Sequence, residues 1–232
     1  MIDCISVENM RQSDAYTIEN FVPSLELMHR AAYGVYKAVT WQGSTAIVVG
    51  SGNNGGDGFA LACILKENGH HCAVFTLSDR LSQDSAYYAN RAKEEGIDIR
   101  PFVPECLQGY HIVVDCLLGT GFQGKLRENY RSAIEAINAS GSYVVSVDIN
   151  SGMNGDTGEA ELAVRSDLTV TIGYVKTGLI SENAGKHMKK LVCVDIGIVL
   201  VKEETKICVA EEVYPGCYLC PPWLDMNIKK AY

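Results

Sequence analysis

The sequence contains no stretch of about 18 consecutive apolar residues, which a membrane-spanning helix would need. Its opening, MIDCISVENMRQSDAY, lacks the basic segment followed by an apolar one that marks a secretory signal. It also has no run of Lys or Arg from which a nucleic-acid-binding face could be built, and its formal net charge is −8. These absences argue against membrane insertion and against nucleic acid as a partner, and they predict a cytoplasmic protein.

A disulfide framework and a structural metal centre are also poorly supported. The nine cysteines are odd in number and scattered, which favours buried reduced thiols over paired ones. Those within apolar runs are Cys63, Cys72, Cys116, Cys193 and Cys208. Cys217 and Cys220 form a lone CxxC with no second pair and no nearby histidines, so a zinc or redox role is disfavoured.

What the chain does contain is a regular alternation of strand and helix patterns. Of its 232 residues, 47% are hydrophobic and 21% are charged, as in one large folded domain. The first forty residues predict two helices, the second capped by Ser24. Thereafter strands are predicted at 45–50, 71–77, 111–118, 142–149, 167–173 and 191–197, and helices at 58–67, 82–95 and 128–139.

This order predicts an α/β fold: a three-layer αβα, Rossmann-like, doubly wound and mostly parallel sheet with two extra N-terminal helices. The regular pattern ends near Glu212, so we expect a domain over residues 1–212 and a tail or linker remnant over 213–232. In open sheets of this kind ligands bind beyond the carboxyl ends of the strands. The residues that follow each strand are therefore the informative ones.

The first such segment is GSGNNGGDG, from Gly50 to Gly58. Its glycines allow the backbone to approach a ligand closely, and the helix that follows can hold phosphate. Gly50, Gly52 and Gly55 match GxGxxG, which alone is a weak signal. A turn with a helix cap is the structural alternative, but such a turn does not require the polar side chains of Asn53, Asn54 and Asp57.

Two further strands end in the same manner. Asp115 interrupts an apolar strand and is followed by a segment with three glycines and by Lys125 and Arg127, whose charges suit phosphate. Asp148 closes the next strand, and Ser151 offers a hydroxyl three residues later. A cap or an Asx turn is the simpler explanation of each. Together with Asp57, however, these residues predict a site of oxygen ligands and acid–base carboxylates at one edge of the sheet.

The motifs GSGNNGGDG, VDCLLGTGFQGK and SVDINSG resemble, in order and spacing, the signature loops of the NAD(P)H-hydrate epimerases, or YjeF N-terminal domain. MRQSDAYTIEN, PSLELMHRAA, TVTIGYVKTGL and VCVDIGI are similar to its opening helices and last strands, so the resemblance spans about Val7 to Ile198. Asn150 stands where the family usually has proline, which predicts a looser Ser151 loop. The tail CPPWLDMNIKKAY faintly resembles the linker to a fused dehydratase domain.

The resemblance implies that hydrated NADH or NADPH (NADHX, NADPHX) is interconverted between its R and S forms, for repair by a companion ADP- or ATP-dependent dehydratase. It implies one potassium ion per subunit, held by Asn54, Asp115 and Ser151. It implies substrate contacts from Asn53, Asn54, Gly55, Gly56, Asp57, Gly119, Thr120, Gly121, Phe122, Gln123, Gly124, Lys125 and Asp148. Asp148 is the first choice as acid–base group and Lys125 the second.

Two other functions stay open at this stage. An NAD-dependent dehydrogenase would also carry GxGxxG, and Asp79 stands near the position expected of its ribose-binding acid. A nucleotide-binding or interaction module without turnover would share the fold. The two N-terminal helices also offer a surface on which the chain could form a homodimer.

Overall fold

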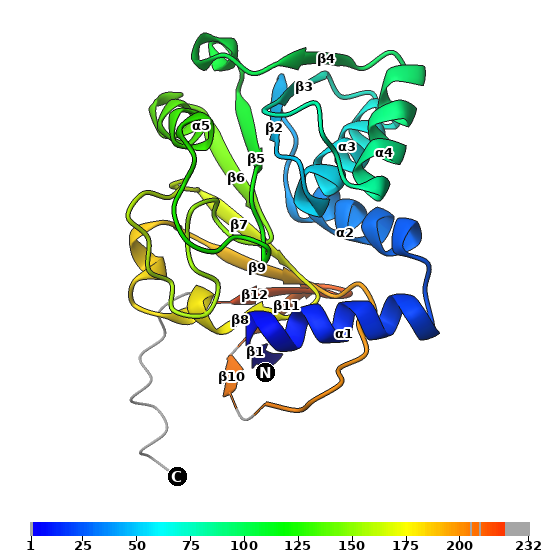
Figure 1. The fold of residues 1–232 in the computed structure, drawn as a ribbon, viewed down its shortest axis with the longest axis vertical. Helices are drawn as coiled ribbons and strands as arrows, with labels where there is room; N and C mark the ends of the chain where they lie inside the picture. Colours follow the sequence, from blue (N-terminus) through cyan, green and yellow to red (C-terminus); the bar gives the residue numbers. More distant parts are fainter. Residues whose placement is uncertain (1, 205, 209, 221–232) are drawn as a thin grey trace.

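A nine-stranded sheet forms the centre of the computed structural model, which describes residues 2–204, 206–208 and 210–220 (Figure 1). Its strand order is β11-β12-β9-β7-β6-β5-β2-β3-β4. Every neighbouring pair from β9 to β4 is parallel, whereas β12 pairs antiparallel with β9 and β11 antiparallel with β12. The strands are β2 (Thr45–Val49), β3 (Cys72–Thr76), β4 (Asp98–Pro101), β5 (Ile112–Cys116), β6 (Tyr143–Val147), β7 (Leu168–Ile172), β9 (Leu191–Val194), β11 (Glu211–Tyr214) and β12 (Cys217–Cys220).

Helices cover both faces of this sheet. α2 (Ser24–Ala38), α3 (Asn53–Glu67) and α4 (Gln83–Glu94) pack on one face, and α5 (Glu128–Ala139) with the short η1 (Pro104–Leu107) packs on the other (Figure 1). Alternate residues of β2 serve the two layers: Ile47 and Val49 join the first cluster, Ala46 and Val48 the second. Burial on both faces explains why these strands are continuously apolar, and it confirms the predicted αβα architecture.

A small second sheet, in the order β10-β1-β8, joins the N-terminus to the end of the domain. β1 (Ile2–Ile5) pairs parallel with β8 (Val175–Lys176) and antiparallel with β10 (Lys206–Cys208). α1 (Val7–Asn20) follows β1, and η2 (Thr177–Ile180) and η3 (Ala184–Lys186) follow β8. The sequence did not predict this sheet, because its short strands take their partners from distant parts of the chain.

The structure corrects two boundaries. Ser24 is the first helical residue of α2 and Pro23 precedes it as the cap, with no side-chain hydrogen bond, so the predicted Ser24 cap is wrong. The regular pattern does not end near Glu212, because β12 completes the sheet through four paired residues with β9. Most of the predicted linker-like tail, residues 221–232, lies outside the described residues.

The strand order indicates which crevice at the edge of the sheet is the expected ligand site. Chain connections run outward in opposite directions from β2 and β5, which are neighbours, and such a switch point is where open α/β sheets bind ligands. Within the described residues, no helix combines the length and apolar character needed to cross a membrane.

Candidate active site

A cavity of about 560 Å³ lies at this switch point. The first turns of α3, the segment after β5 and the end of β6 all line it, as do α1 and β8. The predicted site residues found in its wall are Asn53, Asn54, Asp57, Gly119, Thr120, Gly121, Phe122 and Asp148. The structure therefore brings most of the predicted substrate-binding residues to one place.

The GSGNNGGDG segment is mostly helix rather than loop. α3 begins at Asn53, with Gly52 as its cap, so the helix starts earlier than the predicted Gly58. Residues of this first turn line the cavity, and the free N–H groups at a helix N-terminus can bind an anion such as phosphate. Asn54 and Asp57 are thereby held on a rigid helix, one turn apart.

Gly55 and Gly56 are buried in α3 and do not line the cavity. A Cβ on Gly55 would stand 2.2 Å from the carbonyl oxygen of Gly50, and one on Gly56 would stand 2.6 Å from Cε of Met28. These glycines let α3 pack closely against the chain before it and against α2. Close packing explains both glycines without ligand contact, and their contacts with substrate stay a prediction.

Asp115 lies fully buried beneath the cavity, at the end of β5. Its Oδ1 accepts hydrogen bonds from the Ser151 hydroxyl (2.5 Å) and the Leu117 amide (3.2 Å). Its Oδ2 accepts from the Ser146 hydroxyl (2.9 Å) and the Ser151 amide (3.0 Å). Burial raises the pKa of Asp115, and these hydrogen bonds oppose the rise because they stabilise the carboxylate.

Two of the predicted potassium ligands are therefore in direct contact, and the third is close by. Ser151 accepts a hydrogen bond from the Leu118 amide (2.9 Å), and the next residue, Gly119, approaches the side chain of Asn54. Asn54 donates to the carbonyl of Val147 (3.2 Å), but its buried Oδ1 has no partner in the described part of the chain. A buried amide oxygen without a donor fits a cation ligand.

Asn150 does not loosen the Ser151 loop as its departure from the family pattern predicts. Its Nδ2 donates to the carbonyls of Val164 (3.0 Å) and His187 (2.9 Å) and to the Ser166 hydroxyl (3.0 Å). Its Oδ1 accepts from the Thr169 hydroxyl (2.6 Å). These bonds tie the loop to three other segments, so hydrogen bonding restrains it where a proline ring usually does.

Asp148 adopts an unusual backbone conformation. Among the described non-glycine residues it alone has a positive φ, at 70°, which is a strained geometry often found at functional sites. Its Oδ2 accepts a hydrogen bond from the Thr120 amide (3.3 Å), and Oδ1 binds Nζ of Lys176. A Cβ on Gly119 would stand 2.9 Å from Oδ2, so this neighbour must be small.

Lys176 is the main site residue that the sequence interpretation missed. It is only 1% exposed, and its Nζ also donates to the Ile172 carbonyl (2.8 Å) and the Thr171 hydroxyl (3.1 Å). The three acceptors match the three ammonium hydrogens, and Asp148 is the counter-ion of Lys176. A signal was present, because Lys176 is the charged residue at the end of the otherwise uncharged stretch TVTIGYVK, three residues after the predicted strand 167–173.

The cavity is acidic even with this lysine. Its charged lining residues are Asp14, Asp57, Asp84 and Asp148 against Arg11 and Lys176. Burial, with Asp148 and Asp14 nearby, raises the pKa of Asp57 well above its usual range, although Lys176 opposes the rise. At a pH between the two pKa values, the folded protein therefore binds more protons at Asp57 than the unfolded chain does.

This difference predicts a pH-dependent stability. Between about pH 4, where an exposed aspartate titrates, and the raised pKa of Asp57, the folded state binds more protons than the unfolded state. The free energy of unfolding therefore falls as pH rises through that window. Asp57→Asn should flatten the fall, measured by urea unfolding at several pH values, while the exposed Asp79→Asn retains it. An unchanged slope in Asp57→Asn would contradict this assignment.

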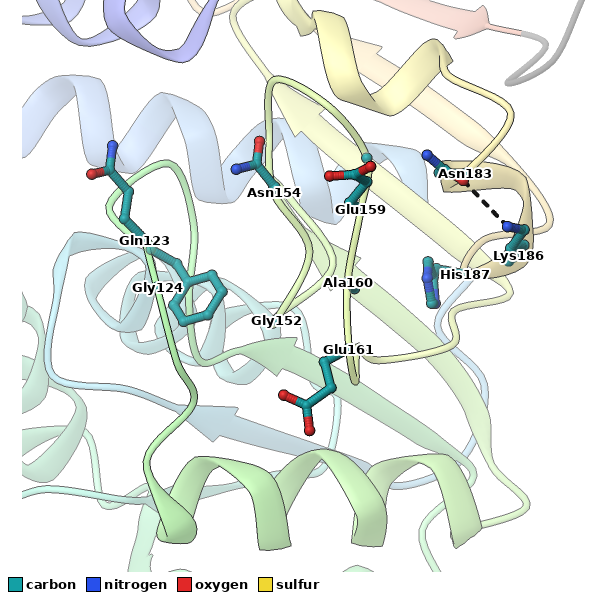
Figure 2. A pocket seen from close by; sticks show the side chains of 12 residues that line it. Gln123, Gly124, Gly152, Asn154, Glu159, Ala160, Glu161, Asn183, Lys186 and His187 are labelled. Atoms are coloured by element: carbon teal, nitrogen blue, oxygen red, sulfur yellow. Dashed lines mark hydrogen bonds between the residues drawn. The ribbon is translucent and has the colours of Figure 1, made fainter.

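The remaining predicted residues lie elsewhere. Gln123 and Gly124 line a second cavity of about 490 Å³ with Asn154, Glu159 and Lys186 (Figure 2). Phe122 lines both cavities, so the segment after β5 separates them. Lys125 is exposed and lines neither.

Asp79, the residue that a dehydrogenase would use on ribose, is also remote from the site. It is exposed and lines a separate cavity near the ends of β3 and β4, together with Phe102 and Pro104. The main cavity is instead lined by the Asp148–Lys176 pair. This placement gives the dehydrogenase interpretation no support from the candidate active site.

Comparison with known proteins identifies the family. The family model described as "YjeF-related protein N-terminus" matches residues 24–178. The chain belongs to this family. As a member of the YjeF-related family it is 33% identical to an NAD(P)H-hydrate epimerase of Limosilactobacillus fermentum, over 82% of this chain and 95% of the relative. It is 38% identical to one of Limosilactobacillus reuteri, over 78% and 89%.

Other relatives of this YjeF-related chain are longer. It is 35% identical to the bifunctional NAD(P)H-hydrate repair enzyme Nnr of Coxiella burnetii over 82% of this chain, but it spans only 40% of that protein. The crystal structure of yeast ynu0, YNL200c, shares the fold with a TM-score of 0.73 at 18% identity, covering 88% of this chain and 97% of that one.

Proposed function

We propose that this protein is an NAD(P)H-hydrate epimerase that interconverts the R and S forms of NADHX and NADPHX. The observation that carries the proposal is the strained Asp148 and its buried ion pair with Lys176, beside the N-terminus of α3 in one cavity. Relatives of nearly the same length that bear this name support it.

The reaction requires the bond between C6 and the hydroxyl oxygen to break and to re-form on the other face of the ring. The lone pair of the ring nitrogen forms a double bond to C6 as the oxygen leaves. Asp148 is placed to exchange a proton with the oxygen, and Lys176 fixes its carboxylate in one orientation. Lys125, the second choice, is exposed, so a role in binding phosphate suits it better.

A potassium ion held by Asn54, Asp115 and Ser151 would supply fixed positive charge beside this site. Asn54 contributes the buried unpaired oxygen, and Asp115 orients the hydroxyl of Ser151. Neutral oxygens next to one carboxylate suit a weakly hydrated monovalent cation.

Potassium is therefore expected to stabilise the fold. A ligand present at about 100 times its Kd stabilises by about 2.7 kcal/mol, which for this chain length raises Tm by about 5–10 °C. Thermal unfolding in potassium chloride and in choline chloride of equal ionic strength measures the difference. Asn54→Ala should abolish it. Equal Tm values for the wild-type protein in both salts would count against the site.

The function itself is tested by incubating the protein with the R form of NADHX. Appearance of the S form above the spontaneous rate supports the proposal, and no acceleration refutes it. A dehydrogenase would instead change NADH absorbance with a partner substrate. A binding module would retain the dinucleotide without converting it.

Further parts of the proposal concern the cellular setting. The bifunctional relatives combine two repair functions by name, and this chain spans less than half of their length. We expect a dehydratase to complete the repair. The cytoplasmic location and the homodimer remain predictions.

A further inference from the structure

Helix α1 contributes a carboxyl group to the candidate active site. Asp14 lies in the middle of α1 and lines the same cavity as Asp57 and Asp148. It is partly buried, and the described residues provide it with neither a hydrogen bond nor an ion pair. It therefore differs from Asp148, whose two oxygens are both engaged.

This contrast matters because epimerisation needs two different proton positions. The departing hydroxyl leaves from one face of the ring and water adds to the other. Asp148, held by its ion pair with Lys176, offers carboxylate oxygens that can accept a proton. Asp148 lines the cavity from the end of strand β6, whereas Asp14 lines it from helix α1, which is not part of the sheet.

We propose that Asp14 is the proton donor for the C6 hydroxyl, opposite Asp148 as the acceptor, an inference that rests on the proposed epimerase function. The Asp14 carboxyl gives its proton to the hydroxyl oxygen while the bond from that oxygen to C6 breaks. The electron pair of the C6–oxygen bond stays on the oxygen, which leaves as water. The lone pair of the ring nitrogen forms a double bond to C6. Water then adds to the other face of C6 and gives its proton to Asp148, so that the epimeric hydrate forms. Proton exchange with solvent afterwards removes the proton from Asp148 and returns one to Asp14.

The charges around Asp14 favour a protonated starting state. The groups that line the cavity with it are Asp57 from α3, Asp84 from α4, Asp148 after β6, Lys176 from β8 and Arg11 from α1. Burial and the Asp148 carboxylate raise the pKa of Asp14, and Lys176 lowers it. Once the proton has left, the Asp14 carboxylate faces the cationic ring and stabilises it.

The test compares wild-type protein, Asp14→Asn and the control Glu19→Gln across a range of pH. Glu19 is an exposed carboxylate on the same helix, so its change removes the same charge outside the cavity. Asp14→Asn is expected to lower kcat by about 10²-fold or more and to remove the decline of kcat at high pH. Glu19→Gln should keep the wild-type rate and pH profile.

A second measurement does not depend on turnover or on a variant that folds. Carbon-13 NMR titration of the wild-type protein should show that the pKa of Asp14 lies above the value of about 3.9 for an exposed aspartate. An ordinary value, or an Asp14→Asn variant with the wild-type rate and pH profile, overturns the proposal while leaving the epimerase function standing. Absence of epimerisation by the wild-type protein overturns both.

Discussion

Replacing Asp148 by asparagine is expected to lower the epimerisation rate by about 10²–10⁴-fold while the protein remains folded. Asparagine has nearly the same shape and keeps an acceptor for the Thr120 amide, but it cannot take up a proton at neutral pH. The measurement is the rate of conversion from R to S, with circular dichroism to confirm the fold. An asparagine variant of wild-type activity would remove Asp148 from the chemistry.

Variants of Lys176 distinguish the chemical role of Asp148 from its structural role. Lys176→Met leaves the Asp148 carboxylate without its counter-ion, which typically costs about 3–5 kcal/mol of stability in a buried pair. Asp148→Asn in the same chain removes the unpaired charge and should recover much of that loss, but none of the activity. Lys189→Met removes a lysine whose side chain is 77% exposed, so it should cost only about 0–1 kcal/mol. Additive losses in the double variant would contradict the coupling.

The sequence was sufficient to predict the layers and most of the cavity wall. The strands β2, β5 and β7 are buried along their full length, and this is why their apolar runs were recognisable. Polar residues directly after such runs are conspicuous, so Asp115 and Asp148 could be found. The carboxyl ends of neighbouring parallel strands meet at one edge, and this placed them together.

The contributions of α1 and β8 could not be predicted by that logic. Asp14 lies on a helix whose place depends on β1, which pairs with β8 some 170 residues later, with Ile5 opposite Lys176. Pairing between distant short strands has no local pattern in the sequence. The start of α3 was misplaced for a different reason, because the glycines that suggest a loop instead allow close packing around the helix. A Cβ on Gly55, for example, would lie only 2.2 Å from the carbonyl oxygen of Gly50.

Asp115→Ala is expected to lower the free energy of unfolding by about 3–5 kcal/mol in urea unfolding. The carboxylate is the acceptor for the Ser146 and Ser151 hydroxyls and for the Leu117 and Ser151 amides. Alanine would leave the Ser146 hydroxyl and the Leu117 and Ser151 amides without an acceptor, whereas the Ser151 hydroxyl could still donate to the Leu118 carbonyl (3.2 Å). Each buried unsatisfied group costs about 1–3 kcal/mol before relaxation. Asp115→Asn should recover little of the lost stability. Each oxygen of Asp115 accepts from two donors, so the amide NH₂ of asparagine would face two donors in place of an acceptor.

Ser146→Ala provides the matched control, since it removes one donor and leaves the carboxylate with its other bonds. Its cost should be near 1 kcal/mol, the usual net value of one hydrogen bond. If Asp115→Ala is no worse than Ser146→Ala, Asp115 does not organise this part of the site. Suppose instead that Asp115→Ala is much less stable than Ser146→Ala and that potassium no longer raises its Tm. Asp115 then acts by holding Ser151 in place, because no other described side chain bonds to the Ser151 hydroxyl.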